Sequence, residues 1–528
     1  MAGRLTLSWV NKDQALVPDE DGGYAWVERD DPRMTEVRLL QQAGHAGEID
    51  DTGEDNLLIQ GDSYDALHAL SRTPEYAKQY RGKIKLVYID PPFNTGQAFA
   101  HYDDALEHSV WLGMMRERLL LIRELLAPNG SVWVHLDDAE MAYCRVLMDE
   151  VFGRGNFIAT VVWQKVYSPK NSARHLSVDQ DYLLVYARNA EIWRPNDLGR
   201  SDAMNAAYRN PDNDPRGPWK PGDLVANKPY SLGRYGFETP GGRTIDGPPP
   251  GRYWRVSLEK LQELDRDGRI WWGEDGNNIP AVKRFLSEVR GRVPQTLWLY
   301  EEVGHNQTGK NEIQELFKGA EPFATPKPER LVQRVIEIGS NPGDIVLDSF
   351  LGSGTTAAVA HKMRRKWVGV ELSCETIEKF ARPRLEHVVA GEDPGGVTKD
   401  VEWAGGGSFR KLEVGPSLYK RAQRRLLLAD WAKGDEFAQA VAAQLGFVYE
   451  PEAPFVGMKG RTRLAVVDGI VDDVVLTSIV AYLDDDERVT IVAKGAAPGA
   501  EQVLRELSSG SRLLKAPRDL VRRGRVVR

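Results

Sequence analysis

The chain has 528 residues and a formal net charge of −8, with 41% hydrophobic and 28% charged residues, which is typical of a globular protein with two or three domains. It has two cysteines, Cys144 and Cys374, which excludes a disulfide framework and a cysteine metal cluster. No uninterrupted apolar run approaches membrane-spanning length, and the acidic balance means that any surface for nucleic acid must be local.

Residues 1–50 form an acidic and irregular stretch at the start of the chain. Acidic runs stand at residues 19–21 (DED) and at Asp30-Asp31. We expect an N-terminal arm here, or a segment that contacts a partner.

A strand at residues 85–89 (KLVYI) ends abruptly in Asp90-Pro91-Pro92-Phe93. Two prolines cannot continue a sheet ladder, and they hold the chain rigid, so the Asp90 carboxylate and the Pro91 carbonyl can face one point as paired acceptors. Phe93 offers a flat ring beside them. Two acceptors and a stacking surface suit a planar aromatic amine, such as the exocyclic amine of adenine or cytosine. The alternative interpretation is a strand-ending turn with a core phenylalanine.

Alternating helices and strands follow this motif. Residues 109–126 have apolar side chains near helical spacing, and residues 128–130 (PNG) end that helix. Residues 131–136 predict a strand, and residues 140–152 a further helix. Such alternation favours an α/β fold with a doubly wound, mostly parallel sheet.

The segment 201–300 differs in composition from the rest of the chain. It has 15 Lys and Arg against 13 Asp and Glu, together with 12 of the 50 glycines and 11 of the 30 prolines. It also contains five tryptophans: Trp219, Trp254, Trp271, Trp272 and Trp298. Loops with cations and aromatic rings suit the reading of base edges in a DNA groove. The alternative is an irregular insertion packed by its tryptophans.

Three other sequence features do not support nucleotide hydrolysis, a cysteine nucleophile or a histidine base. Residues 304–310 (GHNQTGK) match the start of a phosphate-binding loop, but Asn311 replaces the Ser or Thr that would hold magnesium. Cys144 lies in a helix-like run without a preceding proline, which disfavours the thiolate attack needed for cytosine C5 methylation. His135, at the end of its strand, is interpreted as structural.

A second motif begins at residue 344, where DIVLD predicts a buried strand that leads into SFLGSGTT (349–356) and then a helix. Gly352 and Gly354 allow the backbone to approach a ligand closely, and the first turn of the helix offers free N–H groups to an anion. The next strand ends in Glu371, about twenty residues further on, where an acidic residue commonly accepts from ribose hydroxyls in doubly wound nucleotide-binding folds.

The C-terminal part is expected to form a separate small module. Residues 391–408 are rich in glycine and charge and indicate a linker. Strands are expected near 464–467 and 489–492, and helices near 418–431 and 500–507. The tail 512–528 carries seven basic residues against Asp519, so it either contacts phosphate or is a solvated end.

With these motifs in this order, the chain resembles the β class of S-adenosylmethionine-dependent amino-group DNA methyltransferases, including the modification subunits of type III restriction systems. The resemblance covers roughly residues 50–390. It extends to residues 56–62 (NLLIQGD), 130–136 (GSVWVHL), 181–187 (DYLLVYA) and 325–329 (TPKPE). One departure is Ser349, where the family usually has proline.

The resemblance implies the following site. The catalytic residues are Asp90, Pro91, Pro92 and Phe93, and the cofactor is S-adenosylmethionine, with no metal. Thr355, Thr356 and Lys327 would hold the methionine carboxylate, Glu371 the ribose, and Asp62 the adenine. The full set of cofactor-binding residues is Asp62, Lys327, Asp348, Phe350, Gly352, Ser353, Gly354, Thr355, Thr356 and Glu371.

The resemblance also implies a domain order, on a Rossmann-like methyltransferase fold with permuted motifs. The expected segments are 1–50, an N-terminal arm; 51–195, the catalytic half; 196–320, an inserted target-recognition domain; 321–390, the cofactor-binding half; 391–408, a linker; and 409–528, a small α/β module. Expected partners are double-stranded DNA, a second copy of the chain and a separate restriction subunit. The expected location is the bacterial cytoplasm, in association with the nucleoid and not with a membrane.

Several functions remain open from the sequence. The first is site-specific methylation of an exocyclic amine in duplex DNA, with adenine N6 favoured over cytosine N4 because DPPF is more usual among adenine enzymes of the family. The second is methylation of RNA or of a protein amide. The third is a DNA-binding module without catalysis, which the intact Asp90 and GSGTT loop disfavour.

Overall fold

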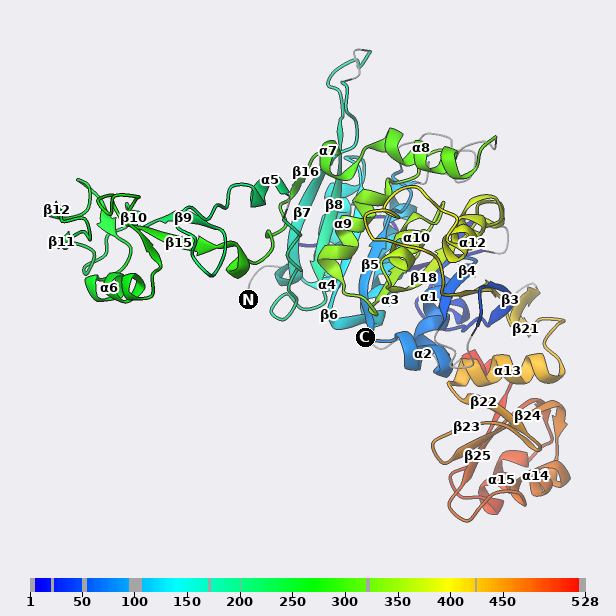
Figure 1. Cartoon of the computed structure of the whole chain (residues 1–528). Coiled ribbons are helices and arrows are strands. Elements are labelled where there is room, and N and C mark those ends of the chain that lie inside the picture. The colour runs from blue at the N-terminus through cyan, green and yellow to red at the C-terminus, as the bar shows by residue number, and fades with distance from the viewer. Residues whose placement is uncertain are drawn as a thin grey trace. The chain divides into compact units, whose positions relative to one another are not determined.

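The computed structural model describes residues 5–19, 23–49, 55–94, 107–169, 172–200, 202–319, 323–422 and 425–521. The chain divides into two compact units (Figure 1), one formed by Met1–Asn196 with Gln295–Arg528 and the other by Asp197–Pro294. Within the described ranges, no helix has the length and apolar character needed to cross a membrane.

The first unit is built on a ten-stranded sheet. Its strands, in spatial order, are β16 (Leu297–Trp298), β7 (Phe157–Gln164), β8 (Gln180–Ala187), β6 (Leu126–Leu136), β5 (Ile84–Ile89), β17 (Ile345–Asp348), β18 (Lys366–Glu371), β4 (Asn56–Gln60), β19 (Phe409–Val414) and β3 (Leu40–Ala46). Six of the nine neighbouring pairs are parallel, and three are antiparallel. The expected mostly parallel sheet is therefore confirmed.

Helices cover both faces of this sheet. One face packs against α1 (Ser63–Arg72), α3 (His108–Leu125) and α4 (Met141–Phe152) in a large apolar core. Successive strand residues point to opposite faces, so Val87 joins this core while Leu86 meets Gly339 of α9 (Glu329–Gly339) on the other face. The helices expected at 109–126 and 140–152 are thus confirmed. The unit also has α2 (Pro74–Tyr80), α7 (Tyr300–Val303), α8 (Asn306–Leu316), α10 (Thr355–Lys362), α11 (Cys374–Thr376) and α12 (Arg382–Ala390).

The parallel pairing places distant segments of the chain at one edge of the sheet. In β5 and β17, Val87 pairs with Leu347, and in β18 and β4, Glu371 pairs with Gln60. The residues that follow these four strands therefore lie together at the carboxyl edge, where ligands bind in open α/β sheets.

The expectation of an irregular N-terminal arm was wrong for much of its length. β1 (Ala15–Pro18) and β2 (Tyr24–Val27) form a hairpin that packs into the main core, and β3 pairs with β19 at the edge of the sheet. β3 (LQQAGHA) lacks a clear apolar pattern, and β1 and β2 are apolar runs of only four residues, so their pairing partners and not their own periodicity determine these strands. Of the acidic run 19–21, only Asp19 lies within the described residues.

The C-terminal part was predicted with mixed success. The expected strands and the last helix are confirmed as β24 (Thr462–Val471), β25 (Arg488–Ala496) and α15 (Ala500–Leu507). The helix expected at 418–431 was wrong, because β20 (Tyr419–Ala422) and β21 (Arg425–Leu428) pair there as antiparallel strands.

The C-terminal sheet is separate from the central one, but its boundary differs from the expected position at 409, since residues 409–414 form β19 of the central sheet. The sheet has five strands in the order β22-β23-β24-β25-β26. The remaining elements of this part are α13 (Gly434–Leu445), β22 (Val448–Glu452), β23 (Phe455–Lys459), α14 (Asp473–Val480), β26 (Arg512–Lys515) and α16 (Arg518–Val521).

The second unit, Asp197–Pro294, is rich in loops and has a small apolar core around Trp254, Leu261 and Ile270. Trp298, counted with this segment in the sequence, lies instead in β16 of the first unit, where its ring stacks on Trp133 at 6.1 Å. The elements of the second unit are α5 (Asp202–Asn205), β9 (Trp219–Asp223), β10 (Val225–Ala226), β11 (Phe237–Glu238), β12 (Thr244–Ile245), β13 (Tyr253–Trp254), α6 (Leu258–Arg266), β14 (Ile270–Trp271) and β15 (Ala281–Phe285).

Candidate active site

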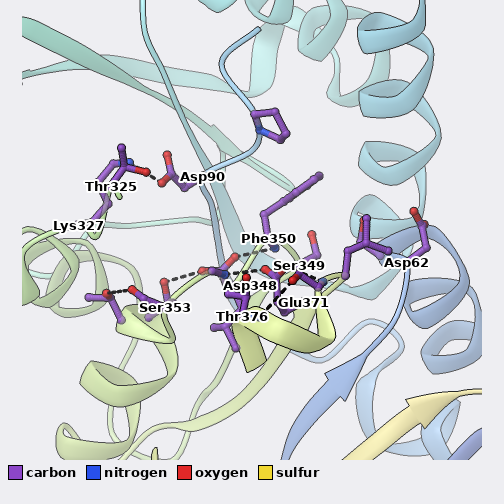
Figure 2. Close-up of a pocket in the computed structure, with 18 of the residues that line it drawn as sticks. Asp62, Asp90, Thr325, Lys327, Asp348, Ser349, Phe350, Ser353, Glu371 and Thr376 are labelled. Atoms are coloured by element: carbon purple, nitrogen blue, oxygen red, sulfur yellow. Dashed lines mark hydrogen bonds and ion pairs between the residues drawn. The ribbon is translucent and has the colours of Figure 1, made fainter. Parts of the chain in front are cut away.

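A cavity of about 330 Å³ lies at the carboxyl edge of the central sheet (Figure 2). It brings together both sequence motifs, which are roughly 250 residues apart in the chain. The predicted residues that line it are Asp62, Asp90, Pro92, Lys327, Asp348, Phe350, Gly352, Ser353, Thr355, Thr356 and Glu371. The other three predicted residues, Pro91, Phe93 and Gly354, are chain neighbours of this lining.

Asp90 stands immediately after β5 and has two differently placed oxygens. Its Oδ2 accepts a hydrogen bond from the Lys327 ammonium, which lies 237 residues later in the chain. Its Oδ1 is buried and has no hydrogen-bond partner in the described part of the chain. A buried acceptor without a donor is costly, so Asp90 is suited to receive a donor from a ligand.

The rest of the DPPF motif is fixed by aromatic side chains. The Pro92 carbonyl accepts from Trp111 Nε1 at 2.7 Å, and the Phe93 ring stacks on His135 with 5.8 Å between centroids. Lys327 Nζ lies 5.1 Å from the Phe93 ring centroid, within cation–π range. The Phe93 ring is therefore held in place by His135 and by the ammonium of Lys327.

His135 itself is held by a buried polar chain. Its Nδ1 lies 2.9 Å from the Tyr88 hydroxyl, and its Nε2 lies 3.3 Å from Asp181 Oδ2. Burial raises the pKa of Asp181, but the hydrogen bond from His135 and the nearby charge of Lys165 outweigh it, so the net pKa is below its ordinary value. His135 thus supports Phe93 from fully buried surroundings, which agrees with its interpretation as structural.

The glycine-rich loop after β17 turns through two positive φ angles, 54° at Gly352 and 83° at Gly354. Asp348 stabilises the turn, because its carboxylate accepts from Phe350 N at 2.9 Å and from the Thr356 hydroxyl at 2.6 Å. Burial raises the pKa of Asp348 to about 7, against the lowering effect of these two donors. Between about pH 4 and pH 7 the Asp348 carboxyl keeps its proton in the folded protein but loses it in the unfolded chain. The free energy of unfolding therefore falls as the pH rises through this range.

Two further carboxylates, Glu371 and Asp62, complete the cavity wall. Glu371 accepts from the backbone N–H groups of Gly352 at 2.8 Å and Ser373 at 2.9 Å. Asp62 caps α1 through Tyr64 N at 2.6 Å, and both of its oxygens lie 2.7 Å from Arg118 Nη2. Each carboxylate oxygen has two acceptor positions, so Asp62, whose Oδ2 accepts from Arg118, retains capacity toward a ligand.

Sequence reasoning missed Arg118, which lines the cavity from α3. It is fully buried, and its Nε donates to the Ser63 hydroxyl at 2.5 Å in addition to its pairing with Asp62. The signal was a charged triplet, Arg116-Glu117-Arg118, between apolar runs of the helix (WLGMM before it and LLLI after it). A buried arginine needs a carboxylate partner, and the acid that ends the NLLIQGD motif supplies it.

A second buried charge network lies behind the glycine loop. Arg384 Nη1 donates to the Thr355 hydroxyl at 2.8 Å, and its Nη2 donates to Glu329 at 2.7 Å. Lys362 Nζ also pairs with Glu329, at 2.8 Å, and with Asp393, at 2.7 Å. All of these side chains are buried. The TPKPE motif therefore supports the glycine loop through its last residue, Glu329.

Cys144 and the GHNQTGK run (304–310) both have structural roles. Cys144 is buried in α4, and burial raises the pKa of its thiol, which leaves it a poor nucleophile. Residues 306–310 of the loop-like GHNQTGK run belong to α8, whose first turn is capped by His305. The described residues contain no group of three or more His, Cys, Asp or Glu placed to hold a metal ion.

A model of the DNA methylase family matches residues 84–382, which is more than half of the chain. The chain belongs to this family. Its match spans the DPPF motif, the second unit and the glycine loop.

The chain is similar to several curated DNA methylases. It is 31% identical over 386 residues to the type III restriction-modification enzyme StyLTI Mod subunit of Salmonella typhimurium, covering 63% of this chain and 57% of that one. It is 33% identical over 299 residues to the type II methyltransferase M.EcaI of Enterobacter cloacae, covering 55% and 62%. The chain therefore spans less than two thirds of the length of these relatives.

Among solved structures, the PvuII DNA methyltransferase (cytosine-N4-specific) is 14% identical and aligns with a TM-score of 0.35. The alignment covers 66% of this chain and 90% of that one.

Replacing Glu329 with Gln tests the buried network. The variant leaves Arg384 without its carboxylate partner and Lys362 with only Asp393, so we expect a loss of about 3 kcal/mol in the free energy of unfolding. Glu375→Gln breaks the exposed pair with Lys379 and is expected to cost less than about 1 kcal/mol. Denaturant titration of both variants measures the difference, and equal small losses would contradict a supporting role for Glu329.

Proposed function

We propose that this chain transfers a methyl group from S-adenosylmethionine to the exocyclic amine of a base flipped out of duplex DNA, with adenine N6 as the favoured target. The observation that carries this proposal is the cavity that is lined both by Asp90, whose buried Oδ1 has no partner among the described residues, and by the glycine-rich loop. Membership of the DNA methylase family and the similarity to Mod subunits and type II methyltransferases support it.

The residues present fit S-adenosylmethionine. The first N–H groups of α10 have no partner within the helix and can accept an anion at the glycine loop. Glu371 and Asp62 both line the cavity, and they are assigned to the ribose hydroxyls and to the adenine amine. Lys327 and the Thr355 and Thr356 hydroxyls are assigned to the methionine carboxylate, although both threonines also contact protein groups.

Asp90 does the chemical work of the site. The lone pair of an exocyclic amine is delocalised into its ring, and hydrogen bonds from the amine to Asp90 and the Pro91 carbonyl localise it on nitrogen. The nitrogen gives up one proton as it gains the methyl group, and the Asp90 carboxylate beside it accepts that proton. The bound cofactor supplies a methyl group made electrophilic by its sulfonium. Catalysis is therefore mainly positioning and electrostatics.

A base inside a duplex cannot reach this cavity, so the target must leave the stack. Phe93 is assigned to hold the flipped ring. The unit Asp197–Pro294 is assigned to DNA recognition, because it exposes the cations Lys228, Arg234, Arg243 and Arg252. Trp219 and Trp254 are buried, so these two tryptophans pack the unit and the exposed cations are the better candidates for DNA contacts.

Asp90→Ala should lower methyl transfer by about 10²- to 10⁴-fold, because the amine loses its acceptor, while the cofactor still binds. Methyl transfer to duplex DNA and calorimetric titration of S-adenosylmethionine measure the two effects separately. A parallel loss of cofactor affinity would refute this role for Asp90.

Gly354→Val is the counterpart of Asp90→Ala, because it should remove cofactor binding. A Cβ at this position would meet Ala381 Cα at 3.2 Å, at a φ of 83°. Gly343→Val serves as the control, because Gly343 has a φ of 85° but open space around it, so it shares the backbone strain and should retain cofactor binding.

The target atom is tested by single-molecule sequencing of DNA from a host that expresses the protein. We expect modified adenines at one short motif. Modified cytosines at one short motif, with adenines unchanged, would overturn the adenine assignment and leave the mechanism standing, since both targets are exocyclic amines on a flat ring.

We also propose that the chain forms a homodimer and provides specificity to a separate restriction subunit. The C-terminal part exposes the large apolar side chains of Ile470, Val474 and Tyr482, which an interface with a second copy would cover. Light scattering should give twice the monomer mass, and Val474→Glu should reduce it. A monomer at all concentrations would contradict the dimer, and an unchanged mass in Val474→Glu would place its interface elsewhere.

A further inference from the structure

The ammonium of Lys327 stands where the proposed function requires the target amine. It donates to Asp90 Oδ2 and lies 5.1 Å from the centroid of the Phe93 ring. These are the two side chains assigned to the amine and to the ring of the flipped base. An N–H donor beside a carboxylate and over an aromatic ring reproduces the contacts of the substrate.

Lys327 occupies one oxygen of Asp90 in this arrangement. Oδ2 accepts from Lys327, while Oδ1 is buried and has no donor among the described residues. A base that stacks on Phe93 and approaches Asp90 from the cavity therefore meets the Lys327 ammonium first. Lys327 is itself only 10% exposed, so its charge needs another anion once it leaves Asp90.

The cavity offers one cation that can meet an anionic ligand. Lys327 and Arg118 are the two cations in the described lining. Arg118 is held by both oxygens of Asp62 and by the Ser63 hydroxyl. Lys327 has Asp90 as its anionic partner and can exchange it for another carboxylate.

We propose that Lys327 exchanges its carboxylate partner, pairing with Asp90 in the free protein and with the carboxylate of the methyl donor in the complex. The exchange rests on the proposed function, since it needs a ligand that carries a carboxylate. Arrival of the donor thereby uncovers Asp90 for the target amine. Lys327 is a positioning residue that links occupation of the donor site to opening of the base site.

The exchange predicts that one substitution at the site, Asp90→Asn, increases the affinity for the cofactor instead of lowering it. The donor carboxylate and Asp90 compete for one ammonium, so removing the charge of Asp90 frees Lys327 before the ligand arrives. Asp90→Asn should therefore bind S-adenosylmethionine more tightly than the wild type, by about threefold to tenfold. Lys327→Met should bind it more weakly, because the ligand carboxylate loses its cation.

The double variant separates the exchange from a general change in charge. In the Lys327→Met background, adding Asp90→Asn should leave the affinity unchanged, because no ammonium remains to be shared. Glu375→Gln removes an exposed negative charge next to Thr376 of the cavity wall, and it should leave the affinity near that of the wild type.

A matched ligand provides a second readout that a structural role of Lys327 would not affect. Decarboxylated S-adenosylmethionine lacks only the carboxylate, so Asp90→Asn and Lys327→Met should have no more than about a twofold effect on its affinity. Isothermal titration calorimetry of the four proteins, wild type, two single variants and the double variant, with both ligands gives all eight affinities.

The outcomes distinguish failure of the proposed function from failure of the lysine exchange. If the wild-type protein binds neither ligand, the proposed function fails. If it binds S-adenosylmethionine but Asp90→Asn does not tighten binding, the exchange is overturned and the proposed function stands. The exchange is also overturned if Asp90→Asn tightens both ligands equally, or tightens binding in the Lys327→Met background.

Discussion

Four carboxylates line one small cavity, and the structure depends on giving each a different partner. Asp348 has a threonine hydroxyl and a backbone N–H, Glu371 has two backbone N–H groups, Asp62 has Arg118, and Asp90 has Lys327. Unpaired charges so close together would repel each other and lose their hydration. Of the four, Asp90 pairs with a lysine ammonium and keeps one buried oxygen without a donor among the described residues. That difference is the reason why we propose Asp90 as the reactive member.

The sheet topology creates this concentration of charge. The parallel neighbours β5, β17, β18 and β4 end at one edge of the sheet. The residues that directly follow these strands therefore lie close together, although they are far apart in the chain. The second unit, Asp197–Pro294, lies in the sequence between the catalytic motif and the glycine loop. A large insertion is tolerated at such a point because the strands on either side are held by the sheet and not by the connection.

The sequence predicted the sheet and most of the cavity, because its central strands have strong apolar patterns and its loops have distinctive glycines and prolines. It failed where structure depends on partners. β3 and the pair β20 and β21 have weak patterns of their own, and Arg118 is fixed by a contact 56 residues away. The pairing of Lys327 with Asp90 was also missed, while the expected role of Lys327 at the methionine carboxylate stays a prediction. No local pattern distinguishes two carboxylate partners that meet only in the folded chain.

The central claim is that Asp90 directs methylation of an exocyclic amine in duplex DNA. Its most direct test is to incubate the protein with duplex DNA and S-adenosylmethionine that carries a deuterated methyl group, and to analyse the digested nucleosides by mass spectrometry. We predict label on the exocyclic nitrogen of one base, with adenine favoured. Label on carbon 5 of cytosine, or DNA without any label while RNA or protein gains it, would contradict the account.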